Sequence, residues 1–323
     1  MWKTVLRRIL ILIPQLIGIS VFIFFLAKQM PGDALMGLIG PDIHPLEIEA
    51  MRERMGINDP WPVQYVRWMS GIVRGDFGQS TAHHRAVTEV IGDRIGITFT
   101  LSLMTMLLTY TIAIPLGIIA GRYSGKIIDR AILIYTFTAM AFPTVVLAIL
   151  MLYWFSPIGT GWFPLTGTVD PFIFAYGTQF EIFRSRLYHL SLPAITGALV
   201  SVVGIIFMLR ANIIDRKSSD YVTFARSKGV PSRTIFGKHI LRNSLIPIAS
   251  NIGLVIAGLF SGSFFIERVF GVQGMGMLFL NSIERRDYPV VNAMIMMFAF
   301  FTAMGILLSD IILSIVDPRI RIK

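Results

Sequence analysis

The chain has 323 residues, of which 54% are hydrophobic and 15% are charged, and it contains no cysteine. Soluble proteins carry about 25% charged residues, so this composition excludes an ordinary soluble domain and favours a membrane protein. The missing cysteines exclude disulfide-stabilised folds and thiolate metal sites. The net charge of +10 is the one feature of the composition that suggests nucleic-acid binding.

Apolar stretches long enough to cross a bilayer recur along the chain, since a spanning helix needs about 20 mostly apolar residues. They predict an all-α, polytopic membrane protein with six transmembrane helices, at residues 9–27, 97–120, 131–155, 192–209, 246–265 and 290–315. Pro115 and Pro143 lie inside the second and third spans, where neighbouring helices can cover the freed backbone groups. The fourth span is short and contains Pro193, which makes it the weakest of the six.

The N-terminus combines basic residues with the first apolar run, as a signal peptide does. Lys3, Arg7 and Arg8 precede the run, and no small-x-small cleavage pattern follows it. We therefore expect residues 1–28 to be an uncleaved N-terminal transmembrane helix.

Residues 29–94 form a long polar segment between the first two spans, which we expect to be an extracytoplasmic region. It is large enough to receive an extracytoplasmic partner protein. Aromatic residues that can anchor it at the membrane interface are Trp61, Tyr65 and Trp68.

The basic residues are distributed unevenly between the two sides of the predicted membrane. With the N-terminus in the cytoplasm, 17 of the 29 lysines and arginines are cytoplasmic: three in 1–8, three in 121–130, eight in 210–245 and three in the tail, 316–323. An excess of Lys and Arg on the cytoplasmic side sets topology, so both termini are predicted to be cytoplasmic. The positive charge is thus an orientation signal, and we expect no nucleic-acid partner.

The segment 210–245 is the largest predicted cytoplasmic loop, and it indicates two short helices. Asp220 can cap the first helix, and Gly229 ends it. Pro231 suits the first turn of the second helix. Apolar residues on one side of that helix, which need a partner surface, are Ile235, Phe236, Ile240 and Leu241. The loop therefore either lies on the lipid bilayer or docks a cytoplasmic protein.

The loop also resembles that of a known family. Ala225-x-x-x-Gly229 ahead of the penultimate span resembles the coupling loop of ABC-importer membrane subunits, and DYVTFARSKG followed by KHILRNSLIP is similar to the oligopeptide/dipeptide branch. Other segments similar to that branch follow in the same order along nearly the whole chain: GDFGQS at 75–80, DRIGITFTLSL at 93–103, HLSLPAI at 189–195, RDYPVV at 286–291 and DPRIRIK at 317–323.

The sequence departs from the general importer pattern in three ways. Where the general loop has Glu-Ala-Ala, this chain has Thr223, Phe224 and Ala225, and the peptide branch commonly lacks the Glu. Pro247 lies further from Gly229 than the corresponding proline does, and Gln273 stands where relatives usually have proline.

The resemblance implies a type I ABC-importer transmembrane domain at 95–315, with its coupling loop at 210–245, in a prokaryotic cytoplasmic membrane. The chain would pair with a second homologous permease, two cytoplasmic ATPases and an extracytoplasmic solute-binding protein. The ATPases would bind ATP and Mg, whereas this chain would bind no cofactor or metal and would not be an enzyme. Residues implied to meet the ATPase are Asp220, Thr223, Phe224, Ala225 and Gly229.

The substrate implied by the resemblance is a peptide, either an oligopeptide or a dipeptide. Similar permeases carry nickel chelates, opines, sugars or other small solutes, and these stay open as alternatives. A secondary transporter is the rival from another class.

Motifs for nucleotide binding or hydrolysis are missing from the sequence. It contains no Gly-x-x-x-x-Gly-Lys-Ser/Thr, His-Glu-x-x-His or Gly-x-Ser-x-Gly. The glycines at 271–276 follow no strand and indicate a turn, or a short re-entrant piece between the fifth and sixth spans. His83 and His84 are adjacent and do not share a helix face, so we expect a solvated surface there and not a metal site.

Ionisable residues are nearly missing from the spans, which argues against a proton-coupled carrier. Arg210 and Asp310 lie at inner span ends, where we expect them to pair or to reach the interface. A weakly polar pathway is predicted from Ser102, Thr105, Thr109, Ser201, Ser261 and Ser263. A solvated rim, or a contact for the binding protein, is predicted from Glu267, Arg268, Glu284, Arg285, Arg286 and Asp287.

Overall fold

The computed structural model describes residues 2–29, 49–50, 53 and 58–316. Within them, five helices are long and apolar enough to cross a membrane, and the number rises to six if one bent pair counts as a single span. The long helices are α1 (Trp2–Gln29), α4 (Val87–Arg122), α8 (Gln179–Lys217), the run Ser232–Gly258, and α15 (Tyr288–Val316). The predicted all-α class with six spans is confirmed. Most of residues 30–57 and the tail from 317 lie outside the described residues.

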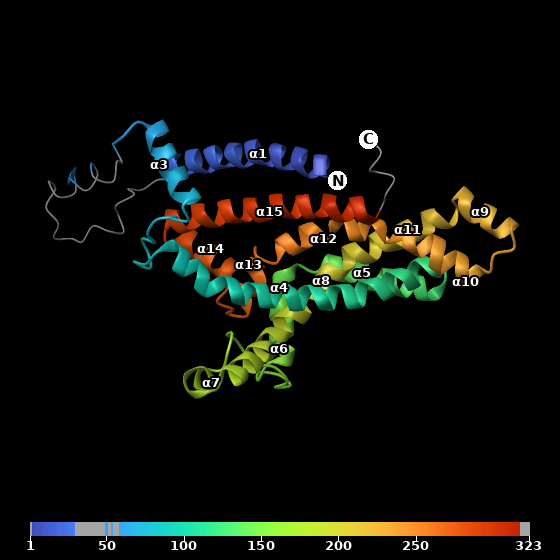
Figure 1. Cartoon of the computed structure of the whole chain (residues 1–323). Coiled ribbons are helices and arrows are strands. Elements are labelled where there is room, and N and C mark those ends of the chain that lie inside the picture. The colour runs from blue at the N-terminus through green and yellow to red at the C-terminus, as the bar shows by residue number, and fades with distance from the viewer. Residues whose placement is uncertain (1, 30–48, 51–52, 54–57, 317–323) are drawn as a thin grey trace.

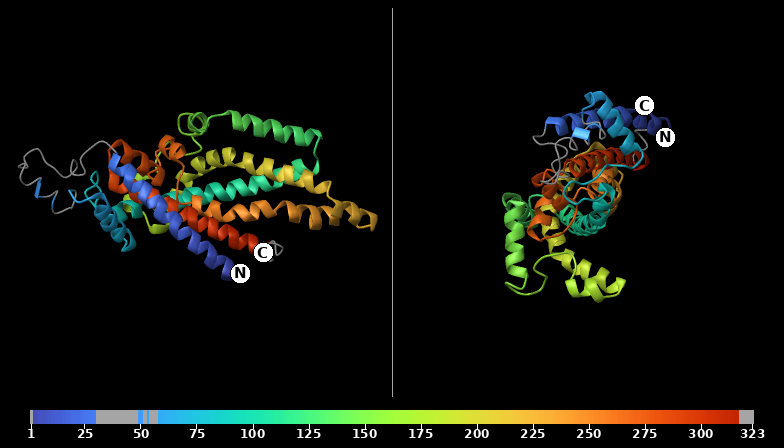
Figure 2. Two further views of the ribbon diagram at one scale, coloured as in Figure 1. Left: turned by 90° about the horizontal axis from the view of Figure 1, so that it is seen from above. Right: turned by 90° about the vertical axis from the view of Figure 1, so that its left-hand side faces the viewer.

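The long helices run roughly lengthwise through the molecule, and α1 and α15 cross the others obliquely (Figures 1 and 2). α4 packs on α8, and α15 packs on both α1 and α12 (Ile246–Gly258). One end of the bundle, called the loop end below, carries α9 (Asp220–Ser227), α10 (Ser232–Thr234), the π-helix η1 (Ile235–Leu241) and α11 (Arg242–Ser244). The opposite end, called the far end, carries α3 (Trp61–Val73), α13 (Phe264–Val269) and α14 (Met275–Glu284).

The third predicted span is not one straight helix. α5 (Ile127–Ala141) and α6 (Thr144–Phe155) meet at an angle of 101°. Phe142, between them, is extended at φ −83° and ψ 123°, because the ring of Pro143 disfavours a helical residue before it. α6 and α7 (Pro171–Tyr176) therefore stand out to one side of the bundle (Figures 1 and 2).

The fourth and fifth spans differ in length from their predictions. α8 has 39 residues and continues through Pro193, and its start is stabilised by a capping box between Thr178 and Glu181. α12 stops at Gly258, so the predicted fifth span is too long at this end. Gly262 follows at φ +75°, and a Cβ built there would lie 2.6 Å from Oε1 of Glu267. The chain turns there because only glycine suits that conformation and that space.

Small residues bring α4 and α8 close together. A Cβ on Gly117 would lie 3.0 Å from Cβ of Leu209, and one on Gly121 would lie 2.7 Å from Cβ of Ile213. Both α8 side chains are fully buried. This close packing, common between membrane helices, holds the end of α8 against the end of α4.

The aromatic residues of α3 contact α1. The ring of Phe24 lies 5.6 Å from that of Tyr65 and 5.7 Å from that of Trp68, and the hydroxyls of Tyr65 and Ser20 are 2.8 Å apart. Two of the three predicted anchors thus pack on the first span, while Trp61 is 62% exposed.

Candidate coupling site

The first helix of the loop begins one residue earlier than the sequence suggested. Ser219 is the N-cap of α9, and its carbonyl accepts hydrogen bonds from Val222 and Thr223. Asp220 is the first helical residue and is exposed, so its prediction as the capping residue is wrong. Its charge still lies in the first turn, where a carboxylate is favoured by the helix dipole.

Gly229 ends this helix in the manner the sequence predicted. Its φ is +73°, and its N–H donates to the carbonyl of Arg226 over 2.9 Å. No atom lies within 4 Å of a Cβ built there. The backbone conformation alone, and not a lack of space, therefore requires glycine.

α9 has one buried face and one exposed face. Val222 is fully buried, and Ala225 packs beside it in a cluster that includes Ile213 of α8. Phe224 is 61% exposed, with the ammonium of Lys228 4.4 Å from its ring centre. Of the residues implied to meet an ATPase, Asp220, Thr223 and Phe224 are therefore available, whereas Ala225 mainly holds α9 in place.

The second helix of the loop is divided into three short pieces. Pro231 is the N-cap of α10, which passes directly into η1 and then α11. Ile235 and Ile240 are buried in the same cluster as Val222, and Phe236 and Leu241 pack against it. The predicted apolar side is confirmed, and its partner is the loop's own first helix together with α8.

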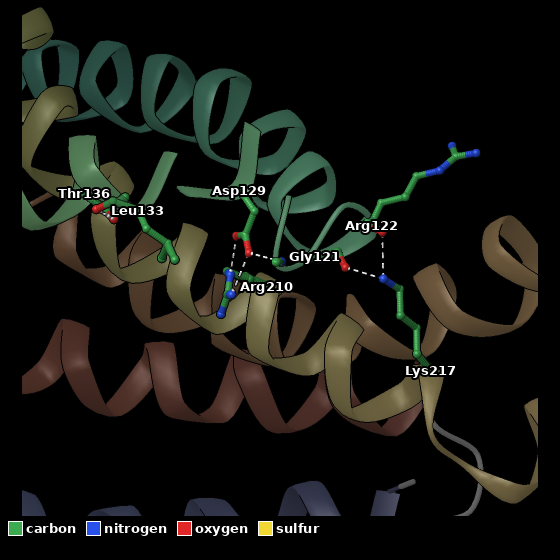
Figure 3. Close-up of polar contacts among 8 residues, drawn as sticks. Gly121, Arg122, Asp129, Leu133, Thr136, Arg210 and Lys217 are labelled. Atoms are coloured by element: carbon green, nitrogen blue, oxygen red, sulfur yellow. Dashed lines mark hydrogen bonds and ion pairs between the residues drawn. The ribbon is translucent and has the colours of Figure 1, made fainter. Parts of the chain in front are cut away.

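An ion pair joins the last part of α8 to α5. The guanidinium of Arg210 donates to both carboxylate oxygens of Asp129, over 2.6 and 2.8 Å (Figure 3). Asp129 is 1% exposed and also accepts from the backbone N–H of Gly125 over 2.7 Å. Arg210 thus pairs, as expected for an inner span end, but its partner was not predicted. The sequence feature that could have indicated this ion pair is the presence of oppositely charged residues at the ends of two predicted spans.

Lys217 joins the end of α8 to the end of α4. Its ammonium donates to the carbonyls of Gly121 and Arg122, over 2.6 and 2.7 Å (Figure 3). These carbonyls belong to the last turn of α4 and have no acceptor role within the helix, so a cation there is favourable. The segment that leads into α9 is therefore attached to both α4 and α5. A displacement of α9 would therefore be transmitted to α4 and α5 through the hydrogen bonds of Lys217 and the ion pair of Arg210.

Comparison with known proteins identifies the family. Residues 113–322 match the family described as binding-protein-dependent transport system inner membrane component, and residues 1–103 match its N-terminal counterpart. The chain belongs to this family. It is therefore the non-catalytic permease of a binding-protein-dependent ABC importer, a multi-pass inner membrane protein that works with a binding protein and with ATPases that bind the ATP.

Similar permeases match over essentially their whole length. The oligopeptide transport system permease protein AppB of Bacillus subtilis is 36% identical over 318 residues, 98% of each chain. The glutathione transport system permease protein GsiC of Escherichia coli is 33% identical over 324 residues, covering 100% of each chain. A probable peptide ABC transporter permease of Sinorhizobium fredii is 31% identical over 317 residues, again 98% of each chain.

In the permease, the weakly polar residues predicted to line a pathway lie on α4, on α8 and in the turn after α12. Thr109 is buried on α4 without a partner for its hydroxyl, and the Thr105 hydroxyl donates to the carbonyl of Leu101. Ser201 is exposed on α8 and Ser102 is half-buried on α4. Ser261 and Ser263 lie in the turn after α12 and not in a span.

Two acidic residues of the predicted rim are buried at the far end of the permease, so the expectation of a solvated rim is wrong for them. Glu267 is fully buried and accepts from the Thr98 hydroxyl over 3.0 Å and from the N–H of Met277 over 2.9 Å. It thereby caps the start of α14 and binds it to α4. Burial raises the pKa of this carboxyl to about 7. The four remaining rim residues are exposed: Arg268, Glu284, Arg285 and Arg286.

Asp287 is also fully buried, at the start of α15. Its carboxylate accepts from the Ser80 hydroxyl over 2.5 Å and from the backbone N–H groups of Thr81 and Ala82 over 3.1 and 3.3 Å. It therefore fastens the turn that precedes α4 to the last span. Sequence spacing could not indicate this contact, because its partners lie 205 to 207 residues away.

Gly271, at φ +62°, and Gly274 lie in the predicted turn between α13 and α14, whereas Gly276 lies in the first turn of α14. His84 is exposed and His83 is half-buried in the turn before α4. Among the described residues, no group of three or more His, Cys, Asp or Glu side chains could hold a metal ion.

Proposed function

We propose that this permease imports peptides, oligopeptides or dipeptides, that an extracytoplasmic binding protein delivers. The observation that carries the proposal is similarity along the whole chain to permeases named for oligopeptide, peptide or glutathione transport. Spans with few charges suit substrates held loosely through their backbones. The exposed hydroxyl of Ser201 and the half-buried one of Ser102 are the best placed of the predicted pathway residues.

Energy for import would enter through α9. Phe224 is a large apolar side chain that is 61% exposed, and Asp220 and Thr223 flank it on the exposed side. An exposed aromatic residue on a short, firmly packed helix suits insertion into a groove of an ATPase. Gly229 would keep α9 at a fixed angle to α10, so that the loop moves as one body.

The proposed assembly contains this permease, a second homologous permease, two ATPases and the binding protein. The Lys and Arg distribution supports a cytoplasmic position for both termini, and the Arg8–Asp310 ion pair, at 3.1 Å, supports a common side for the two chain ends. We divide the chain into an N-terminal helix at 1–28, an extracytoplasmic region at 29–94, the permease domain at 95–315 and the tail at 316–323.

Uptake by cells lacking the gene tests the substrate. We expect labelled di- and oligopeptide uptake to be lost and then restored by the gene, with uptake of a nickel chelate and an opine unchanged. Loss of nickel or opine uptake with normal peptide uptake would contradict the peptide assignment. A pull-down through a C-terminal tag tests the assembly. We expect P-loop ATPases and a second permease, whereas recovery of this chain alone would favour a self-sufficient carrier.

A further inference from the structure

A basic pocket lies at the loop end, between the end of α4 and the two helical parts of the loop. Its volume is about 200 Å³, which is far more than the ~10–15 Å³ that a cavity needs to hold one water molecule. Four cations and one hydroxyl line it above an apolar floor: Arg122, Lys217, Arg226, Ser232 and Arg233, with Ile235, Phe236 and Ile240 beneath.

Among the residues that the structure describes, no carboxylate lines this pocket. Two other basic residues near this end have acidic partners, since Arg210 pairs with Asp129 and Arg8 with Asp310. Four like charges that face one concave space repel each other, and the repulsion is strongest where water is partly excluded. An anion in the pocket would remove this unfavourable interaction.

Two of the cations are held in position without an anion. Lys217 gives two of its three ammonium hydrogens to carbonyls of α4, which leaves one donor free. The guanidinium of Arg122 lies 4.9 Å from the ring centre of Phe236. Arg226 and Arg233 are exposed and come from the two different helical parts of the loop. The four cations thus converge from four elements: α4, α8, α9 and α10.

We propose that this pocket binds a phosphate group, carried either by an anionic lipid headgroup of the adjacent leaflet or by a soluble phosphate compound. Three of its four cations are arginines, whose planar fork of donors matches phosphate oxygens. The apolar floor of Ile235, Ile240 and Phe236 suits the glycerol end of a lipid headgroup. A phosphate there would connect α9 to α4 through Arg226 and Arg122, and so stiffen the loop.

Binding is measured on the purified full-length chain in a neutral detergent. The probes are a short-chain phosphatidylglycerol, inorganic phosphate and a short-chain phosphatidylcholine, each titrated while the thermal midpoint is recorded. The pocket variant is Arg226→Gln with Arg233→Gln. Its matched control is Lys238→Gln with Arg242→Gln, which removes the same charge from exposed residues of the same loop outside the pocket.

We expect saturable binding of an anionic probe, with a dissociation constant that rises at least ~10-fold in the pocket variant and less than ~3-fold in the control. Phosphatidylglycerol binding alone would assign the site to lipid, and inorganic phosphate binding with equal affinity would assign it to a soluble compound. Equal losses in both variants, or no saturable binding, would overturn the proposal. So would loss of ATPase recovery in the pocket variant without any phosphate binding, because the cations would then contact protein.

Discussion

Arg210 of α8 and Asp129 of α5 form a two-point ion pair, with N–O distances of 2.6 and 2.8 Å, between residues 81 positions apart. Arg210 lies on α8, the helix that directly precedes α9 in the chain, and α9 is the element that we propose meets an ATPase. It therefore has two consequences, one for the stability of the loop end and one for the transmission of motion from the loop to the spans.

Removing the arginine of this pair should lower the stability of the permease more than neutralising the aspartate does. Arg210→Ala leaves a carboxylate that is 1% exposed without its counter-ion, which we expect to cost ~3–5 kcal/mol of stability. Asp129→Asn should cost less, because Arg210 is 24% exposed and can turn toward water. The thermal midpoint of the detergent-purified permease measures both losses.

The Arg8–Asp310 ion pair supplies the control for that comparison. Its side chains are 48% and 24% exposed, so Arg8→Ala should cost no more than ~1 kcal/mol. If Arg8→Ala and Arg210→Ala lowered the midpoint equally, the special importance of the Asp129 pair would be disproved.

Gly229 should tolerate substitutions in the order Asn, then Ala, then Val. A non-glycine residue at φ +73° costs ~1–2 kcal/mol, less for asparagine and more for a β-branched side chain. We expect Gly229→Val to insert normally and yet to lose ATPase recovery and peptide uptake. Gly237 in the same loop has ordinary φ and equally open surroundings, so Gly237→Ala is the control. Normal uptake by correctly inserted Gly229→Val would refute the coupling role of this turn.

Substitutions of Phe224 and of Val222 should separate an effect on ATPase binding from an effect on the stability of the fold. Phe224 is 61% exposed, so Phe224→Ala should change the midpoint little while weakening ATPase recovery and uptake at least ~10-fold. Val222 is fully buried, and Val222→Ala removes two methyl groups from the loop cluster, at ~1.5 kcal/mol. Pull-down and thermal midpoint are measured on both variants. Unchanged ATPase recovery in Phe224→Ala would exclude this side chain from the contact.

Glu267 should make stability depend on pH at the far end. Burial raises its pKa from the ordinary 4.5 to about 7. Between these values the folded state holds the proton and the unfolded state releases it, so stability falls as pH rises from 4.5 to 7 and is then constant. The total change for such a shift is ~3 kcal/mol.

Midpoints recorded from pH 5 to pH 8 test this dependence. Glu267→Gln should abolish most of the slope, because the amide does not titrate. Glu284→Gln, at an exposed residue of the same end, should retain it. A slope that survives in Glu267→Gln would assign the pH dependence to another group.

The sequence by itself determined the all-α class, the number of spans, the site of the loop and its two helical parts. These follow from the length of apolar runs, from proline and glycine positions and from the placement of Lys and Arg, which are local properties of the chain. The segments similar to peptide permeases, in their order, also indicated the family that the full-length matches then confirmed.

Only the tertiary structure decided which polar residues are buried and with what partners. Glu267 and Asp287 look like members of an exposed rim until Thr98 and Ser80 lie against them. The basic pocket likewise depends on where distant helices pack. A local sequence pattern indicates what kind of surroundings a segment needs, but it does not indicate which other segment will provide them.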